Sequence, residues 1–488
     1  MKLKDIIQSE NPTDQISALQ SGRNHPIPDA EQAKKALDPK LHDINDPIKR
    51  KDKQVRVDVD AESDSAKKVI TADGEAVATR TEKVARIAVA IQKLIIKRAV
   101  SFCFGNPVEY NATPANDQEK AVLFALKRIL KDVKSNSMNR KIGRAIFGFK
   151  ECAEYWYPVP KEHGKYGFKS KFKLRCTILS PAFGDTLYPY FDDSGDMVAF
   201  SRAYSHKDNK GVSTDYFETF TDEEHWLWRT NGGIGAQLVD GFPKPVAIGK
   251  IPIVYGYQDK FETEDVDKLI DRLEHLLSNF GDTNDYHASP KIFVTGQING
   301  WSKKGESGSV IEGEDGATMQ YVSWQSAPEA VKLEIETLLK MIYTISQTPD
   351  ISFDAVKGLG AISGVALKLL FMDAHLKVQD KREIFDEYLQ RRVNVILAYI
   401  GKMNTALEKD CETIVIEPEL VPYMLTNELD ELKYWLTANG NKPVISQEES
   451  VERAGISKDV QGTMAKIKEQ HASENSFIIG EPQIDGDA

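Results

Sequence analysis

The chain has 488 residues, of which 41% are hydrophobic and 28% are charged, and its formal net charge is −11. This length can support a large core or roughly two to four sub-domains, and the composition is that of a globular protein. The sequence has no run of eighteen or more apolar residues and no apolar segment at its N-terminus, so we expect neither a membrane span nor a signal peptide.

The N-terminal region, residues 1–79, is polar and interrupted by prolines, which predicts short helices and irregular arms. Residues 49–53 form one basic run. We interpret it as a solvated surface. Tight DNA binding requires many clustered cations, and this acidic chain has only this one basic run, so only weak contact with DNA remains open. From Thr81 onward, apolar residues recur at three- and four-residue steps, which predicts a helix with one buried face. A Gly-Asn-Pro turn at 105–107 ends this helix.

The following region changes from helix to strand. Residues 117–148 predict helix, whereas residues 149–254 contain short β-like runs separated by turns, a pattern typical of an α+β domain with mostly antiparallel pairing. The aromatic residues of these runs are interpreted as core residues rather than as base-stacking surfaces. They are Tyr155, Trp156, Tyr157, Trp226 and Trp228.

Two amphipathic helices with an insert between them come next. The first begins with Thr263 as its N-cap, and the second begins at Pro328, where a missing N–H costs nothing. Each has a stripe of apolar residues at helical spacing, so we expect the two helices to bury their stripes against each other. The insert, residues 290–327, is rich in glycine, has strand-like ends and predicts a small β excursion.

The C-terminal third begins with a glycine-rich loop at residues 351–362. A very long helix follows at 363–400, with Gly401 as its predicted end. We expect further helix from Leu425 to Gln470 and a disordered tail over 472–488.

Motifs that carry chemistry are missing from the sequence. There is no GxxxxGK[ST], HExxH or GxSxG pattern, and Gly358, Gly360 and Gly364 have the wrong spacing for a dinucleotide fingerprint. His275 and His287 stand near carboxylates but twelve residues apart, which is unsuited to a metal site on one helix turn. The four cysteines are scattered without a CxxC pair, which fits ordinary buried thiols in a reducing cytoplasm. We therefore predict no catalytic residue, metal or cofactor.

Several segments jointly resemble the bacteriophage portal protein family of siphophage type. The likeness extends over roughly residues 80–405 in order and spacing, and each segment is weak alone. The segments that carry it are 95–110, 144–155, 178–183, 202–204, 249–254 and 363–368.

The resemblance implies a portal fold, in which a ring of about twelve copies stands at one vertex of a phage head. Genome DNA enters through the ring, driven by a separate terminase, and leaves the same way. The implied partners are other copies of the chain, double-stranded DNA held weakly and without sequence preference, the terminase large subunit, a head-tail adaptor, and the major capsid and scaffold proteins. The implied location is the virion, and the host cytoplasm during assembly.

Carried over by position, the resemblance assigns a part of the portal fold to each region of this chain. The assignments are an N-terminal arm at 1–79, an α+β wing at 80–263, stem helices at 264–289 and 328–350, a clip at 290–327, a tunnel loop at 351–362, the long helix and wing closure at 363–425, a helical crown at 426–471, and the tail at 472–488.

Candidate site residues follow from these assignments. An acidic conduit with isolated lysines would let DNA slide. The candidates for contact with DNA in the channel are therefore Lys332, Lys340 and Lys357. The glycines Gly358, Gly360 and Gly364 would let the tunnel loop shift. Candidates for terminase or adaptor docking on the clip are Trp301, Lys303 and Lys304. Two alternatives stay open: another ring-forming head-tail protein that does not gate DNA, and a nucleotide- or metal-dependent enzyme.

Overall fold

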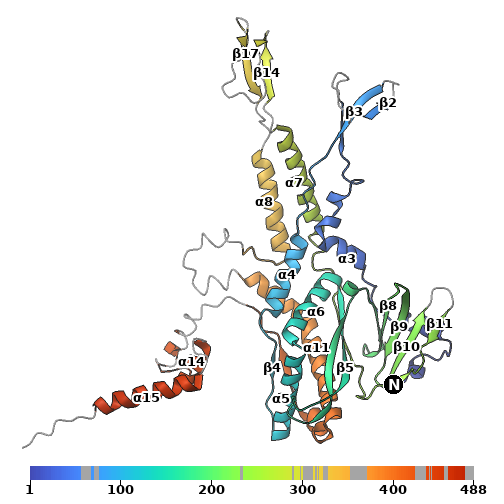
Figure 1. Cartoon of the computed structure of the whole chain (residues 1–488), viewed down its shortest axis with the longest axis vertical. Helices are drawn as coiled ribbons and strands as arrows, with labels where there is room; N and C mark the ends of the chain where they lie inside the picture. The colour runs from blue at the N-terminus through green and yellow to red at the C-terminus, as the bar shows by residue number, and fades with distance from the viewer. Residues whose placement is uncertain are drawn as a thin grey trace, which may run out of the picture. The chain divides into compact units, whose positions relative to one another are not determined.

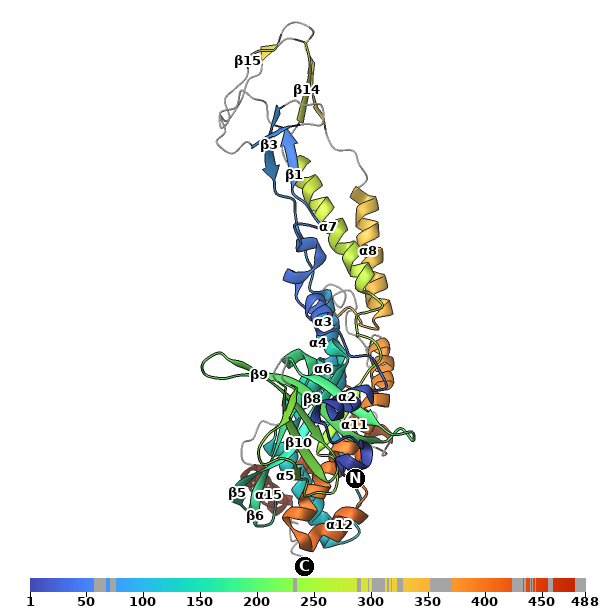
Figure 2. The same ribbon diagram turned by 90° about the vertical axis from the view of Figure 1, so that its right-hand side faces the viewer.

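The protein is described here from a computed structural model (Figures 1 and 2). It divides into two compact units, residues 1–356 with 371–423 and residues 357–370 with 424–488, and each unit is described by itself. The structure describes residues 1–56, 67–70, 76–230, 235–287, 291–296, 298–300, 312–313, 316, 318–322, 328–351, 371–423, 433, 436–438, 440, 442–443, 445–454 and 460–478.

The turn-separated runs after residue 149 form two antiparallel sheets, as predicted. The three-stranded sheet has the order β13-β5-β6, and the larger sheet has the order β11-β10-β9-β8-β7 with β12 paired to β10. Apolar side chains from both sheets share one core, which includes Ala153, Phe200 and Ile253. Trp156 and Trp228 are fully buried, which confirms their interpretation as core residues. The strands are β5 (Glu151–His163), β6 (Ser170–Leu179), β7 (Thr186–Phe191), β8 (Met197–Lys207), β9 (Ser213–Phe220), β10 (Glu224–Thr230), β11 (Ala236–Leu238), β12 (Lys244–Pro245) and β13 (Ile253–Tyr257).

Four helices pack beside the three-stranded sheet, where Figure 1 shows α5, α6 and α11 close to β5. The guanidinium of Arg392 is buried among them and donates to both carboxylate oxygens of Glu154 and, at 2.7 Å, to Asn139 Oδ1. The long helix does not end at Gly401 but continues to Met403. A side chain at position 401 would lie tightly against Glu408, so close packing accounts for this glycine. The helices are α4 (Ile91–Phe104), α5 (Asp117–Asp132), α6 (Ser135–Phe149) and α11 (Met372–Met403), followed by η4 (Thr405–Leu407) and α12 (Glu408–Thr413). Smaller elements are η3 (Pro181–Phe183) and the paired strands β4 (Glu109–Asn111) and β18 (Glu417–Glu419).

The N-terminal region contains short helices, as expected, but also an antiparallel sheet that the sequence did not predict. Leu3 and Leu19 are fully buried against the larger sheet. The helix predicted from Thr81 begins only at Ile91, because β3 continues to Glu82 and the next residues are extended. The elements are α1 (Leu3–Ile6), α2 (Pro12–Ser21), α3 (Ala30–Leu37), η1 (Pro39–Leu41), η2 (Asp43–Asn45), β1 (Lys53–Arg56), β2 (Lys67–Ile70) and β3 (Ala76–Glu82), and the sheet order is β1-β3-β2.

The helix pair, α7 (Asp267–His287) and α8 (Pro328–Ile345), lies side by side in both views (Figures 1 and 2). The two predicted stripes do bury each other, and α4 completes their core. Strands of the insert pair as β14 (Lys291–Thr295) with β17 (Thr318–Val322) and β15 (Ile298–Gly300) with β16 (Glu312–Gly313).

The described elements of the second unit are α14 (Gln447–Ala454) and α15 (Val460–Ile478). α15 continues past residue 471, where the sequence predicted the helical part to end and the disordered tail to begin. The reason is that the next helix breakers, Gly480 and Pro482, come only after Ile478.

Candidate functional site

The predicted channel lysines of the helix pair are exposed on α8. Lys332 is 76% exposed and lies 3.8 Å from Glu336, an ion pair of four-residue spacing. Lys340 is exposed on the same helix. The other predicted site residues lie outside the described residues: Trp301, Lys303, Lys304, Lys357, Gly358, Gly360 and Gly364.

α8 carries apolar side chains that stay partly exposed in the part of the chain that the structure describes. Leu333 is 65% exposed, Met341 is 44% exposed and Ile345 is 47% exposed. Met341 and Ile345 are four residues apart and lie one above the other, whereas Leu333 lies two turns earlier, about 80° around the helix axis and beyond the exposed Thr337. We call this interrupted row of Leu333, Met341 and Ile345 the stripe. Partly exposed large apolar side chains grouped on one helix are a candidate contact surface.

The base of the helix pair is held by a buried ionic cluster that comes from three segments. Glu262, just before α7, lies 2.6 Å from the ammonium of Lys377 and 2.8 Å from that of Lys381, both on α11. Lys377 also donates at 2.8 Å to the carbonyl of Ser346, at the end of α8. A single ammonium group therefore joins α11 to both helices of the pair.

Electrostatics favour the charged form of this cluster. Glu262 and Lys377 are each at most 6% exposed. Burial acts to raise the pKa of Glu262, but the two ammonium groups outweigh it and hold the pKa below its usual value. Because Lys377 donates to a carbonyl at the C-terminus of α8, its positive charge also interacts favourably with the negative end of the α8 dipole.

A left-handed residue ends α8. Gln347 has φ of 47°, and the amide of Thr348 donates at 2.9 Å to the carbonyl of Tyr343, a pattern typical of a Schellman motif. Arg98 of α4 donates at 2.7 Å to the carbonyl of Pro349. The predicted second helix, 328–350, therefore ends five residues early, because the backbone turns here and its free carbonyls find other donors.

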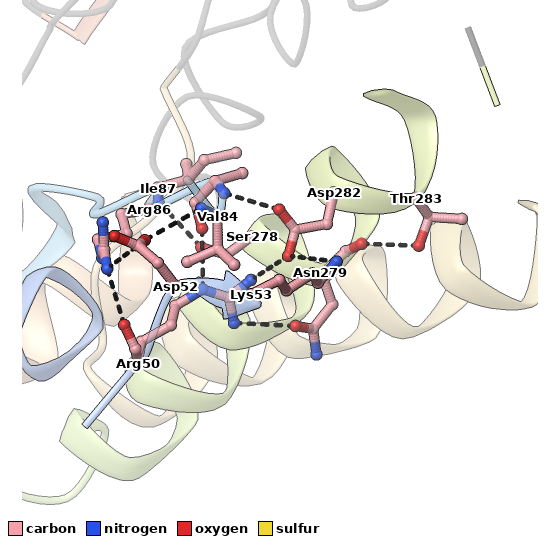
Figure 3. Close-up of polar contacts among 11 residues, drawn as sticks. Arg50, Asp52, Lys53, Val84, Arg86, Ile87, Ser278, Asn279, Asp282 and Thr283 are labelled. Atoms are coloured by element: carbon pink, nitrogen blue, oxygen red, sulfur yellow. Dashed lines mark hydrogen bonds and ion pairs between the residues drawn. The ribbon is translucent and has the colours of Figure 1, made fainter. Parts of the chain in front are cut away.

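Residues 83–90, which we call the strap, run extended along α7 (Figure 3). Three alternate backbone amides donate to side chains four apart on the helix, as Ala85 to Asp282 (2.7 Å), Ile87 to Ser278 (2.9 Å) and Val89 to Glu274 (2.8 Å). Two strand residues advance about 6.7 Å and four helix residues about 6.0 Å, so the two repeats match closely over three rungs. The helix side chains thus accept the hydrogen bonds that a neighbouring strand would accept. Because the amides of the strap are satisfied in this way without a helix, the helix predicted from Thr81 begins only after the strap.

Charged side chains close the strap on its outer side (Figure 3). Arg50 donates to Asp282 and Asn279 at 2.8 and 2.9 Å, and to the carbonyl of Ala85 at 2.9 Å. Arg86 donates at 2.8 Å to Asp52. The basic run at 49–53, interpreted from sequence as solvated, therefore contributes an arginine that fastens the N-terminal region to α7.

Glu274, which accepts from the amide of Val89 in the strap, also contacts a buried histidine from the N-terminal region. His42 Nδ1 lies 2.6 Å from Glu274 Oε1, and its Nε2 lies 3.1 Å from the carbonyl of Ala36. Both ring nitrogens face acceptors, which favours the doubly protonated ring. Burial lowers the pKa of His42, but the hydrogen bond and charge of Glu274 outweigh it, so the pKa lies above its usual value of 6.5.

The described residues offer little else for chemistry. They contain no group of three or more His, Cys, Asp or Glu side chains placed to hold a metal ion, and His275 lies 3.5 Å from Asp271 in a partly exposed ion pair. None of the described helices is long and apolar enough to cross a membrane. The contacts described above hold the helix pair in place.

Sequence reasoning missed both the ionic cluster and the strap. The strap did leave a signal, because Glu274, Ser278 and Asp282 form a polar stripe at four-residue steps on α7. The cluster left no comparable signal, since Glu262 is more than a hundred residues from Lys377 and Lys381 in the chain.

Comparison with known proteins gives one extensive match. The family model described as "Phage portal protein, SPP1 Gp6-like" matches residues 29–476, which include the helix pair, the strap and the ionic cluster. No curated protein matches the sequence significantly. Two solved structures show distant similarity at 11% identity. A chain of "Neck of empty GTA particle computed with C6 symmetry" has a TM-score of 0.36 over 75% of this chain and 89% of that chain. A chain of "Virion of native gene transfer agent (GTA) particle" has a TM-score of 0.34 over 75% and 88%.

Proposed function

The chain belongs to the SPP1 Gp6-like family of phage portal proteins, and we propose that its copies form a closed ring that conducts double-stranded DNA at one vertex of a capsid. The role is structural rather than enzymatic: the ring admits the genome, releases it, and provides docking sites for the proteins that pump DNA or attach the tail.

The observation that carries the ring proposal is the partly exposed apolar stripe of α8. Leu333, Met341 and Ile345 remain 44% to 65% exposed, whereas Leu338 and Ile342 of the same helix are buried against α7 and α4. A second copy of the chain can bury this stripe, and repeating the same contact around an axis closes a ring. Full burial of an exposed Leu or Met side chain contributes about 1.5–3 kcal/mol, and these partly exposed side chains would contribute a corresponding fraction of it.

The parts of the ring follow by position in the family. We propose that α7 and α8 are the stem, the insert at 290–327 is the clip that meets the terminase and the head-tail adaptor, and residues 80–263 with 363–425 are the wing. The loop at 351–362 would be the tunnel loop, and 426–471 the crown. Contacts with capsid and scaffold proteins belong to the same proposal.

Lys332 and Lys340 are proposed to face passing DNA. Both are exposed on α8, and the ion pair of Lys332 with Glu336 at 3.8 Å is loose. Loose, isolated cations suit sliding, because no position releases many counterions at once. Lys357, which the resemblance assigns to the tunnel loop, is proposed with them by that position alone and lies outside the described residues.

The test of the ring is a charge placed in the α8 stripe. Met341→Glu should leave the helical content of the purified protein unchanged, because the side chain is exposed in the single chain, and should abolish rings in native mass spectrometry and electron microscopy. The matched control, Met341→Leu, preserves volume and should assemble normally. Rings of wild-type size from the Met341→Glu protein would show that this stripe is not the subunit contact.

A further inference from the structure

A basic groove lies where α5 ends and α6 begins. The sequence predicted one continuous helix over 117–148, but the backbone turns left-handed at Lys134, with φ of 57°, and the helix starts anew at Ser135. The turn opens a hollow of about 490 Å³, which is lined by Lys127, Lys131, Lys134, Arg140 and residues 135–137, with Tyr110 and Leu130.

The charge of this region contrasts with the rest of the chain. Residues 120–150 contain nine Lys or Arg and a single carboxylate, Asp132, in a protein of net charge −11. Asp132 is already engaged by Lys173 at 2.8 Å. The four groove cations are exposed, and none forms an ion pair with a carboxylate in the part of the chain that the structure describes. Their field is therefore available to an external anion.

The residue types in the groove are those that contact a nucleic acid backbone. Phosphate oxygens are bound mostly by Lys and Arg, with Ser, Asn and Tyr as supporting donors, and all the groove residues except Leu130 are of these types. Lys127 and Lys131 are four residues apart on α5, about 6.0 Å along the helix axis. Successive phosphates of one DNA strand advance about 3.4 Å, so this pair spans about two phosphate steps.

A protein partner fits this groove less well. Protein interfaces are depleted in lysine and place apolar side chains at their centre, whereas here three of the four cations are lysines and the lining offers only Leu130 and the ring of Tyr110 as apolar surface. We propose that the α5–α6 groove binds the phosphate backbone of double-stranded DNA. This site goes beyond the proposed conduit, which requires only that DNA slides past isolated lysines.

The experiment measures binding of a short DNA duplex to the assembled full-length protein by fluorescence anisotropy over a range of salt. Engagement of four phosphates gives a slope of about −3.6 for log K against log salt, so affinity should fall about 150-fold between about 50 and 200 mM salt. The variant Lys127→Gln/Lys131→Gln/Lys134→Gln/Arg140→Gln should lose most of this affinity and nearly all of the groove's share of the slope.

A matched control removes four other cations. The control replaces four exposed lysines of β5, β6 and their connection by Gln: Lys161, Lys165, Lys169 and Lys171. It removes the same number of positive charges as the groove variant. This control should retain the wild-type slope. Electron microscopy of both variants should show rings, which separates failure of the groove from failure of ring formation.

Two results would overturn the proposal. One is a groove variant that binds DNA with wild-type affinity and slope. The other is stronger binding of poly-glutamate than of duplex at the same salt concentration, which would assign the groove to an acidic protein segment.

Discussion

Replacement of Lys377 by Met tests whether the buried ionic cluster holds the base of the helix pair. Met preserves much of the aliphatic stem but removes the ammonium that contacts Glu262 and the Ser346 carbonyl. Removal of one partner from a buried ion pair costs about 3–5 kcal/mol, and the loss of a hydrogen bond to a buried carbonyl costs about 1 kcal/mol more. Because Lys381 still neutralises Glu262 at 2.8 Å, Glu262 is not left unpaired, so the ion-pair loss should fall below this range and we expect a total of about 3 kcal/mol.

The assay is amide hydrogen exchange over the last turn of α8 and the first turns of α11. A local loss of about 3 kcal/mol corresponds to exchange on the order of 100-fold faster at these amides. The control is Lys332→Met on the same α8, where the exposed ion pair contributes no more than about 0.5 kcal/mol, so exchange should change little. Equal exchange in Lys377→Met and the control would refute the reasoning, because it would mean that packing alone holds the three segments.

Two further substitutions test the end of α8 and the strap. Gln347→Gly should raise the thermal midpoint, because glycine adopts φ of 47° without the strain of about 1 kcal/mol that a side chain adds there. Gln347→Ala is the control and should not raise it. For His42, the pKa in the folded state exceeds the usual 6.5, so its contribution is complete below that value and declines as pH rises through the folded pKa. The drop in thermal midpoint caused by His42→Leu should therefore be larger at pH 6 than at pH 9, and a drop that is constant or grows with pH would contradict the charged-ring interpretation.

Helices and strands could be predicted from the sequence where a single residue pattern repeats. The apolar stripes of α7 and α8 repeat at helical spacing and pack as expected, and the turn-separated runs after residue 149 form antiparallel sheets. In these segments local propensity and tertiary packing favour the same structure, so a periodicity argument suffices.

The failures occur where a distant partner decides the local structure. The strap has helical periodicity, yet Glu274, Ser278 and Asp282 satisfy its amides almost two hundred residues away and keep it extended. The break at Lys134 was also missed, and with it the concentration of cations around the α5–α6 groove. Counting only consecutive basic residues hides a cluster whose members are spaced along two helices.

The polar contacts of the helix pair explain why one of its faces stays apolar and exposed. α7 is fastened by the strap along Glu274, Ser278 and Asp282, and the end of α8 is fastened by Lys377, so neither attachment uses the stripe of Leu333, Met341 and Ile345. A stripe that a monomer needed for its own stability would be covered by that monomer. Because these contacts leave the stripe unused, it is available to the neighbouring copy in the proposed ring, and each subunit would hold its helices in position before such a ring closed.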